Sequence, residues 1–124
     1  MLVNFYKYQG TGNDFVIIDL RSNNFQLTEN NIKTICNRKF GIGSDGLMIM
    51  KNHNDYDFEM KFFNPDGSES FCGNGSRCAV LYSFHHGLIQ RKCTFLTNDG
   101  VHKASVKKDE IVRVSIRSPQ EFNE

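Results

Sequence analysis

The amino-acid sequence predicts an α+β fold, in which a curved, mostly antiparallel sheet wraps around a central apolar helix. Strand-like segments separated by turn signals fill most of the chain, and one segment of helical length is apolar on much of its circumference. The length, 124 residues, suits one domain with one core. No linker, repeat or low-complexity segment divides the sequence.

Four strands and one helix are predicted in the first half. The strands are expected at residues 5–8, 15–20, 47–51 and 57–63. Residues 9–14 are predicted to form a glycine-containing loop between the first two strands, and a second glycine-rich loop is expected at 40–46. Thr28 is expected to cap a helix that continues to about Asn37.

The second half begins with a predicted β-turn at residues 64–67, Asn-Pro-Asp-Gly. The apolar helix is expected from about Gly73 to His86, with Gly87 as the residue after its C-terminus. Because this helix is apolar on much of its surface, it should be largely surrounded by protein. Further strands are expected at residues 94–97, 101–107 and 111–116.

Composition excludes some classes of partner. Fifteen Lys and Arg residues balance 14 Asp and Glu residues, for a formal net charge of +1, so nothing points to nucleic acid. No apolar run approaches the roughly 18 residues needed to cross a bilayer, and the first residues lack the features of a signal peptide. We therefore expect a cytoplasmic protein with no nucleic-acid or membrane partner.

Cys72 is the residue whose position most clearly suits a role in catalysis. It lies at or beside the N-cap of the apolar helix, where the helix dipole and unpaired N–H groups favour a thiolate. Gly73 and Gly75 leave room beside the sulfur, and the same N–H groups can hold a carboxylate. A cysteine base or nucleophile next to an anion cradle suits an amino-acid substrate.

Competing interpretations of the cysteines are weaker. The other three, Cys36, Cys78 and Cys93, are expected to be buried and inert, and no Cys-x-x-Cys or Cys/His spacing indicates zinc. The phosphate-binding patterns Gly-x-x-x-x-Gly-Lys-Ser/Thr and Gly-x-Gly-x-x-Gly are absent. His85 and His86 lie about 20 Å further along the helix, which excludes a Cys–His hydrolase built on Cys72.

Four motifs in the same order and spacing make the sequence similar to the diaminopimelate epimerase family. They lie at residues 7–15, 41–46, 63–69 and 72–78, and the resemblance covers essentially the whole chain. It implies a cofactor-independent isomerase that converts LL-diaminopimelate to its meso form for lysine and peptidoglycan synthesis. One cysteine would take the α-proton, and a second would deliver a proton to the opposite face.

The same resemblance assigns residues to roles. Cys72 matches the first catalytic cysteine, and Asn13 and Asn64 match asparagines that bind the substrate. Gly73 and Asn74 match residues that bind the α-carboxylate. Neither a metal nor a cofactor is implied, and the expected ligand is a small amino-acid substrate.

Two departures from the family pattern bear on function. Gly46 stands where the family often has a substrate-contacting glutamine. Family enzymes are about twice as long and have two similar halves, so residues 1–118 are interpreted as the amino-terminal domain and 119–124 as the start of a connection. The second cysteine would then belong to a second half, and this chain alone is expected to be inactive. Cys78 cannot replace it, being about 9 Å further along the same helix.

Three alternatives stay open at this stage. Gly46 is compatible with a superfamily racemase that acts on another amino acid. Two copies of this chain could self-associate and bring two Cys72 residues together. A structural or binding module with an inert Cys72 would show slow alkylation at neutral pH.

Overall fold

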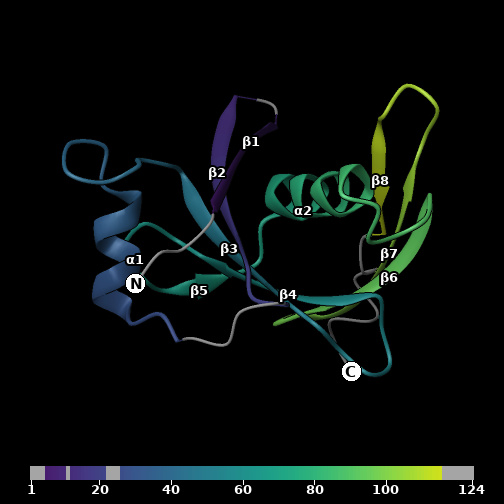
Figure 1. Cartoon of the computed structure of the whole chain (residues 1–124), viewed down its shortest axis with the longest axis horizontal. Helices are drawn as coiled ribbons and strands as arrows, with labels where there is room; N and C mark the ends of the chain where they lie inside the picture. The colour runs from purple at the N-terminus through teal and green to yellow at the C-terminus, as the bar shows by residue number, and fades with distance from the viewer. Residues whose placement is uncertain (1–4, 11, 22–25, 116–124) are drawn as a thin grey trace.

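A curled sheet surrounds the longer helix in the computed structural model, which describes residues 5–10, 12–21 and 26–115 (Figure 1). The strand order is β1-β2-β3-β4-β6-β7-β8, and β5 pairs with β4 beside this path. The strands are β1 (Phe5–Gly10), β2 (Asn13–Asp19), β3 (Gly46–Lys51), β4 (Phe58–Phe63), β5 (Glu69–Ser70), β6 (Lys92–Thr97), β7 (Gly100–Val106) and β8 (Val112–Val114). The helices are α1 (Glu29–Cys36) and α2 (Gly73–His85). The expected α+β architecture is confirmed.

The sheet is mostly antiparallel, as predicted. The pairs β1–β2, β3–β4, β4–β5, β6–β7 and β7–β8 are antiparallel. The pairs β2–β3 and β4–β6 are parallel, which the sequence analysis did not anticipate. Each parallel pair is joined by a connection that contains a helix, α1 for the first and α2 for the second.

Helices cover both faces of the sheet at β2 and β3. Phe15 and Ile17 belong to the hydrophobic cluster that includes α2 residues, whereas Val16 and Ile18 belong to the cluster around α1. Successive side chains of a strand point to opposite faces, so these neighbours are divided between the two clusters. Burial on both faces explains why this strand is a continuous apolar run rather than an alternating one.

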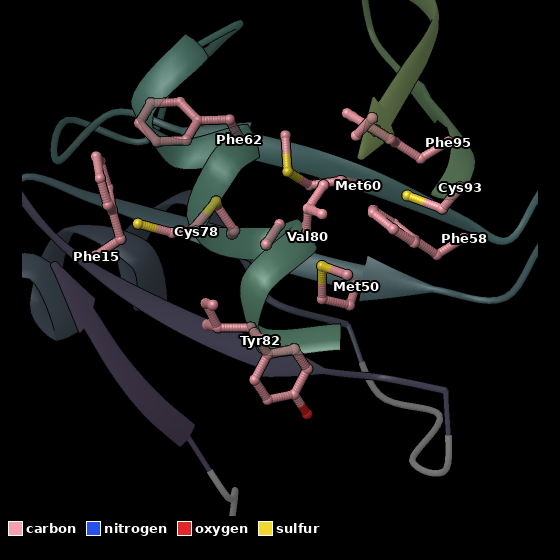
Figure 2. Close-up of a cluster of buried hydrophobic side chains, with 14 of the residues drawn as sticks. Phe15, Met50, Phe58, Met60, Phe62, Cys78, Val80, Tyr82, Cys93 and Phe95 are labelled. Atoms are coloured by element: carbon pink, nitrogen blue, oxygen red, sulfur yellow. The ribbon is translucent and has the colours of Figure 1, made fainter. Parts of the chain in front are cut away.

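The longer helix α2 is largely enclosed by the sheet, as its composition predicts (Figure 1). Its buried residues are Gly75, Ser76, Cys78, Ala79, Val80, Tyr82 and Ser83. Figure 2 shows Cys78, Val80 and Tyr82 among aromatic and methionine side chains of the surrounding strands. A Cβ atom on Gly75 would lie 3.1 Å from the Phe62 ring, so a larger residue would hold the helix away from β4. Within the described residues, no helix combines the length and hydropathy needed to cross a membrane.

The first hairpin differs from its prediction. The ladder between β1 and β2 continues to the pair Gly10 and Asn13, so most of the loop predicted at residues 9–14 is strand. Gly12, with φ +86°, adopts the left-handed conformation that glycine allows. Backbone pairing between the two strands outweighed the local glycine signal, and it places Asn13 at the start of a strand.

Helix boundaries follow the capping signals in the sequence. Thr28 caps α1 and forms a reciprocal capping box with Asn31. Gly87 follows α2 with φ +69°, as predicted. Strand β5 was not predicted, since two residues carry no periodicity. Strand β8 occupies only part of the predicted segment 111–116, of which residue 116 lies outside the described residues, as does the predicted boundary at 118.

Two serines buried in α2 differ in hydrogen bonding, and this difference predicts opposite effects on stability. Ser76 Oγ donates to the Gly73 carbonyl oxygen at 2.8 Å, whereas Ser83 Oγ has no partner among the described residues. Ser83→Ala should raise the free energy of unfolding by about 1 kcal/mol, because it removes an unsatisfied hydroxyl and introduces a better helix former. Ser76→Ala, the matched control, should lower it by about 1 kcal/mol. Urea unfolding measures the free energy of unfolding of both variants, and an equal decrease in the two would contradict the expectation.

Candidate active site

Cys72 occupies the N-cap of α2, as the sequence predicts. Its backbone is extended, with φ −131° and ψ 117°, and its Sγ accepts a hydrogen bond from the Gly75 N–H at 3.4 Å. Its carbonyl oxygen accepts the Ser76 N–H at 2.9 Å. The side chain is half-buried. The sulfur therefore lies at the positive end of the helix dipole, where negative charge is favoured, and it remains accessible.

Asn13 and Asn74 meet in the folded chain although they are 61 residues apart. Asn74 Nδ2 donates to Asn13 Oδ1 at 3.2 Å, and Asn13 Nδ2 donates to Asp45 Oδ2 at 3.3 Å. The two bonds set which way the Asn13 amide points. The two residues that the family resemblance predicts to bind substrate and carboxylate are thus joined directly, at the first turn of the helix that Cys72 caps.

Arg77 lies one helical turn beyond Gly73, near the start of α2. A Cβ atom built on Gly73 has Arg77 Nη1 as its nearest neighbour, at 3.8 Å, so the space beside this residue is open. Arg77 Nη2 donates to Asn74 Oδ1, and Arg77 is exposed. Sequence reasoning missed Arg77, although its position one helical turn beyond Gly73 is a signal that a cation lies near the proposed carboxylate cradle.

Asn64 lies apart from this group, in the turn between β4 and β5. Its Nδ2 donates to Ser68 Oγ at 3.0 Å, and its Oδ1 accepts from Ser70 Oγ at 3.2 Å. Among the described residues, no hydrogen bond joins it to Cys72 or to the Asn13–Asn74 pair. Its connection to the site is through β5, whose second residue, Ser70, is two positions before Cys72.

A charged network supports the Asn13 side of the site, and the sequence analysis did not identify it. Arg38 Nη2 donates to Asp14 Oδ1 at 2.7 Å and to Asp45 Oδ1 at 3.0 Å, and Lys7 Nζ lies 2.7 Å from Asp14 Oδ2. Hydrogen bonds from Arg38 and Lys7 hold the pKa of the Asp14 carboxyl well below its usual range. Both aspartates belong to the glycine-rich segments, so the network joins the start of β2 to the loop before β3.

Gly46, where the family often has glutamine, is the buried first residue of β3. A Cβ atom there would lie 2.4 Å from Cζ of Phe62. The aromatic ring fills the space that a longer side chain at position 46 would need. A longer side chain at position 46 would therefore require the Phe62 ring to move.

The other three cysteines are buried, which confirms the expectation for Cys36, Cys78 and Cys93. Burial raises the pKa of the Cys78 thiol to about 11 and that of the Cys93 thiol to about 12. It also raises the pKa of Cys36, against a hydrogen bond from Ser44 that lowers it. Neutral thiols of this kind do not act as bases near pH 7.

Comparisons with known proteins agree with this fold. The solved structure of a PhzF-family phenazine biosynthesis protein from Bacillus anthracis matches with a TM-score of 0.66 and 21% sequence identity. The matched region covers 90% of this chain and 39% of that protein's chain. The chain therefore has the fold of the PhzF and epimerase-like proteins, here as a half-barrel wrapped around one helix.

Sequence relatives are more specific than the fold. The model of the diaminopimelate epimerase family matches residues 5–120. The diaminopimelate epimerase of Flavobacterium psychrophilum is 42% identical over 120 residues, covering 95% of this chain and 47% of the relative. That of Nitratiruptor is 43% identical over 117 residues, covering 92% of this chain and 45% of the relative. The chain belongs to the diaminopimelate epimerase family and spans about half the length of the curated relatives it matches.

Selective alkylation tests the difference between the cysteines. At pH 7, iodoacetamide should modify Cys72 first, because it is half-exposed while the other three are buried. Cys78 and Cys93 should react only as the pH rises above about 10, since thiolates are the reactive form and burial raises both pKa values. Mass spectrometry locates the label, and Cys72→Ser should remove the fast phase. Equal rates at Cys72 and Cys78 would contradict the assignment.

A substitution at Gly46 tests the contact with Phe62. Gly46→Ala should lower the free energy of unfolding by about 1–3 kcal/mol, because the new Cβ atom overlaps the ring. Phe62→Leu in the same chain should recover part of the loss, so that the two changes are not additive. Urea unfolding of the single and double variants measures this, and a Gly46→Ala chain as stable as the parent would show that the ring moves freely.

Proposed function

We propose that this chain is the part of a cofactor-independent amino-acid epimerase that carries the first of two acid–base cysteines, Cys72. Its family membership favours LL-diaminopimelate as the substrate and the meso isomer as the product. The carrying observation is the position of Cys72 at the N-cap of α2, beside the Asn13–Asn74 pair. Such an enzyme would serve lysine and peptidoglycan synthesis in the cytoplasm.

The proposed first step is proton transfer from the α-carbon. The Cys72 thiolate would form an S–H bond as the Cα–H bond breaks, leaving the electron pair on the substrate. Part of that charge would move onto the α-carboxylate, which the N–H groups beside Gly73 and Asn74 would stabilise. Asn13 and Asn64 would bind the rest of the substrate near the reacting carbon. The preorganised helix terminus supports this assignment, because it needs no rearrangement as charge develops.

Inversion requires a second acid on the opposite face of the α-carbon. Cys36, Cys78 and Cys93 are buried, and burial raises their pKa values, so none of them suits this role. We infer that the second cysteine belongs to a second half, with residues 1–118 as the first domain and 119–124 as the start of the connection. Pairing of two copies through their Cys72 faces is the alternative source. In either case, the isolated monomer should not complete a two-base turnover.

A second candidate function rests on Gly46. Because Phe62 fills the space beside it, a side-chain contact from position 46 to the substrate would be absent. A racemase of the same superfamily, acting on another amino acid, would account for this. Comparing LL-diaminopimelate with a panel of L-amino acids on the full-length protein separates the two, since the first function requires preference for the diamino diacid.

Exchange of the α-proton tests the proposed function. In deuterated water, the full-length protein that contains this chain should incorporate deuterium at the α-carbon of LL-diaminopimelate, as followed by proton NMR. Cys72→Ser should reduce the rate by at least about a thousandfold, since serine is not ionised near pH 7. Cys93→Ala, at a buried cysteine, is the matched control and should retain exchange.

Two results would contradict the proposal. Undiminished exchange by Cys72→Ser would remove this cysteine from the mechanism. Rapid epimerisation by the isolated chain, shown to be monomeric by light scattering, would show that no second half or second copy is needed.

A further inference from the structure

A row of stacked rings crosses the sheet and ends beside Cys72. Phe58 of β4 stacks on Phe95 of β6, with ring centroids 4.9 Å apart and planes 7° apart. Phe95 in turn stacks on His102 of β7, at 5.6 Å and 24°. The last pair is His102 and Phe71, at 4.8 Å and 4°. The first three rings belong to directly paired positions of neighbouring strands, so the sheet itself sets their alignment.

His102 is held more tightly than a stacked ring alone would be. It is only 2% exposed, its Nε2 lies 2.7 Å from Asp99 Oδ1, and its Nδ1 lies 3.0 Å from the Ser115 carbonyl oxygen. Burial opposes ionisation of Asp99, but hydrogen bonds from Thr97 and His102 outweigh it and lower the pKa of its carboxyl. Contacts at both ring nitrogens fix the plane of the imidazole against which Phe71 stacks.

Phe71 belongs to the two-residue connection between β5 and α2. On one side, β5 pairs with the end of β4 through Ser70 and Phe62. On the other side, Cys72 begins the helix. The stack on His102 therefore anchors the residue directly before the cysteine, in a segment outside both the strand and the helix.

We propose that His102 is a positioning residue for Cys72, acting through Phe71. By holding Phe71, it keeps the Cys72 sulfur within reach of the Gly75 N–H, at the start of α2. The inference rests on the proposed function only in giving Cys72 a chemical role. The geometry of the thiol can be tested without any substrate.

Alkylation of Cys72 reports on this positioning. In His102→Leu, iodoacetamide should modify Cys72 about threefold to tenfold more slowly at pH 7, because the loss of one aromatic stack loosens the N-cap. A purely structural role predicts the opposite sign, because partial unfolding would speed the labelling of all four cysteines.

A double-mutant cycle separates positioning from general weakening. Phe71→Leu removes the other ring of the same stack and should slow the alkylation of Cys72 to a similar extent. If both residues act through their contact, the double variant should be no slower than either single variant. Phe71→Leu also provides the test if His102→Leu fails to fold.

His86→Leu is the matched control. His86 is likewise packed on two aromatic rings, Tyr6 and Tyr82, but it lies at the far end of α2. Its loss should leave Cys72 alkylation unchanged. An unchanged or faster rate in folded His102→Leu or Phe71→Leu, or additive slowing in the double variant, would overturn the inference. Because none of these measurements uses substrate, they are independent of the α-proton exchange result.

Discussion

Close packing of α2 against the sheet that encloses it is the interaction on which the rest of the structure depends. Small residues make it possible: a Cβ atom on Gly75 would meet the Phe62 ring at 3.1 Å, and one on Gly10 would meet Cys78 Sγ at the same distance. Gly10 lies opposite Asn13 in the first hairpin. The approach of this hairpin to the helix therefore brings Asn13 to Asn74, so core packing and site geometry have one cause.

The proposed site depends on residues elsewhere in the chain that orient its side chains. Asn13 is oriented by Asp45, which Arg38 holds in turn, and Cys72 is preceded by a ring stacked on His102. Both supports come from parts of the chain far from the helix that they serve. Preorganisation of this kind lowers the reorganisation needed when charge develops, which is what a proton transfer from carbon requires.

The features that could be predicted from the sequence are those that depend on residues close together in the chain. The cap at Thr28, the alternation in β4 and the open space at Gly73 each depend on neighbouring residues, and each prediction was confirmed. The space predicted at Gly75 is instead filled by Phe62 and Met48, which pack against α2 from distant strands. The loop expected at residues 9–14 was wrong because a ladder to another strand decided it. The parallel pairs and the Arg38 network depend on residues distant in sequence, and no periodicity encodes them. Resemblance to a family, rather than spacing, suggested the proposed roles of Asn13 and Asn64.

The strands at the two ends of the sheet, β1 and β8, both contact α2, which lies between them in sequence. This arrangement has a consequence for biosynthesis. When α2 leaves the ribosome, β6, β7 and β8 have not yet emerged from it, so part of the apolar surface of α2 has no cover. Folding must await contacts between distant segments, which slows it and exposes apolar surface meanwhile. Nascent chains from which β8 has not yet emerged should therefore be the species that chaperones retain.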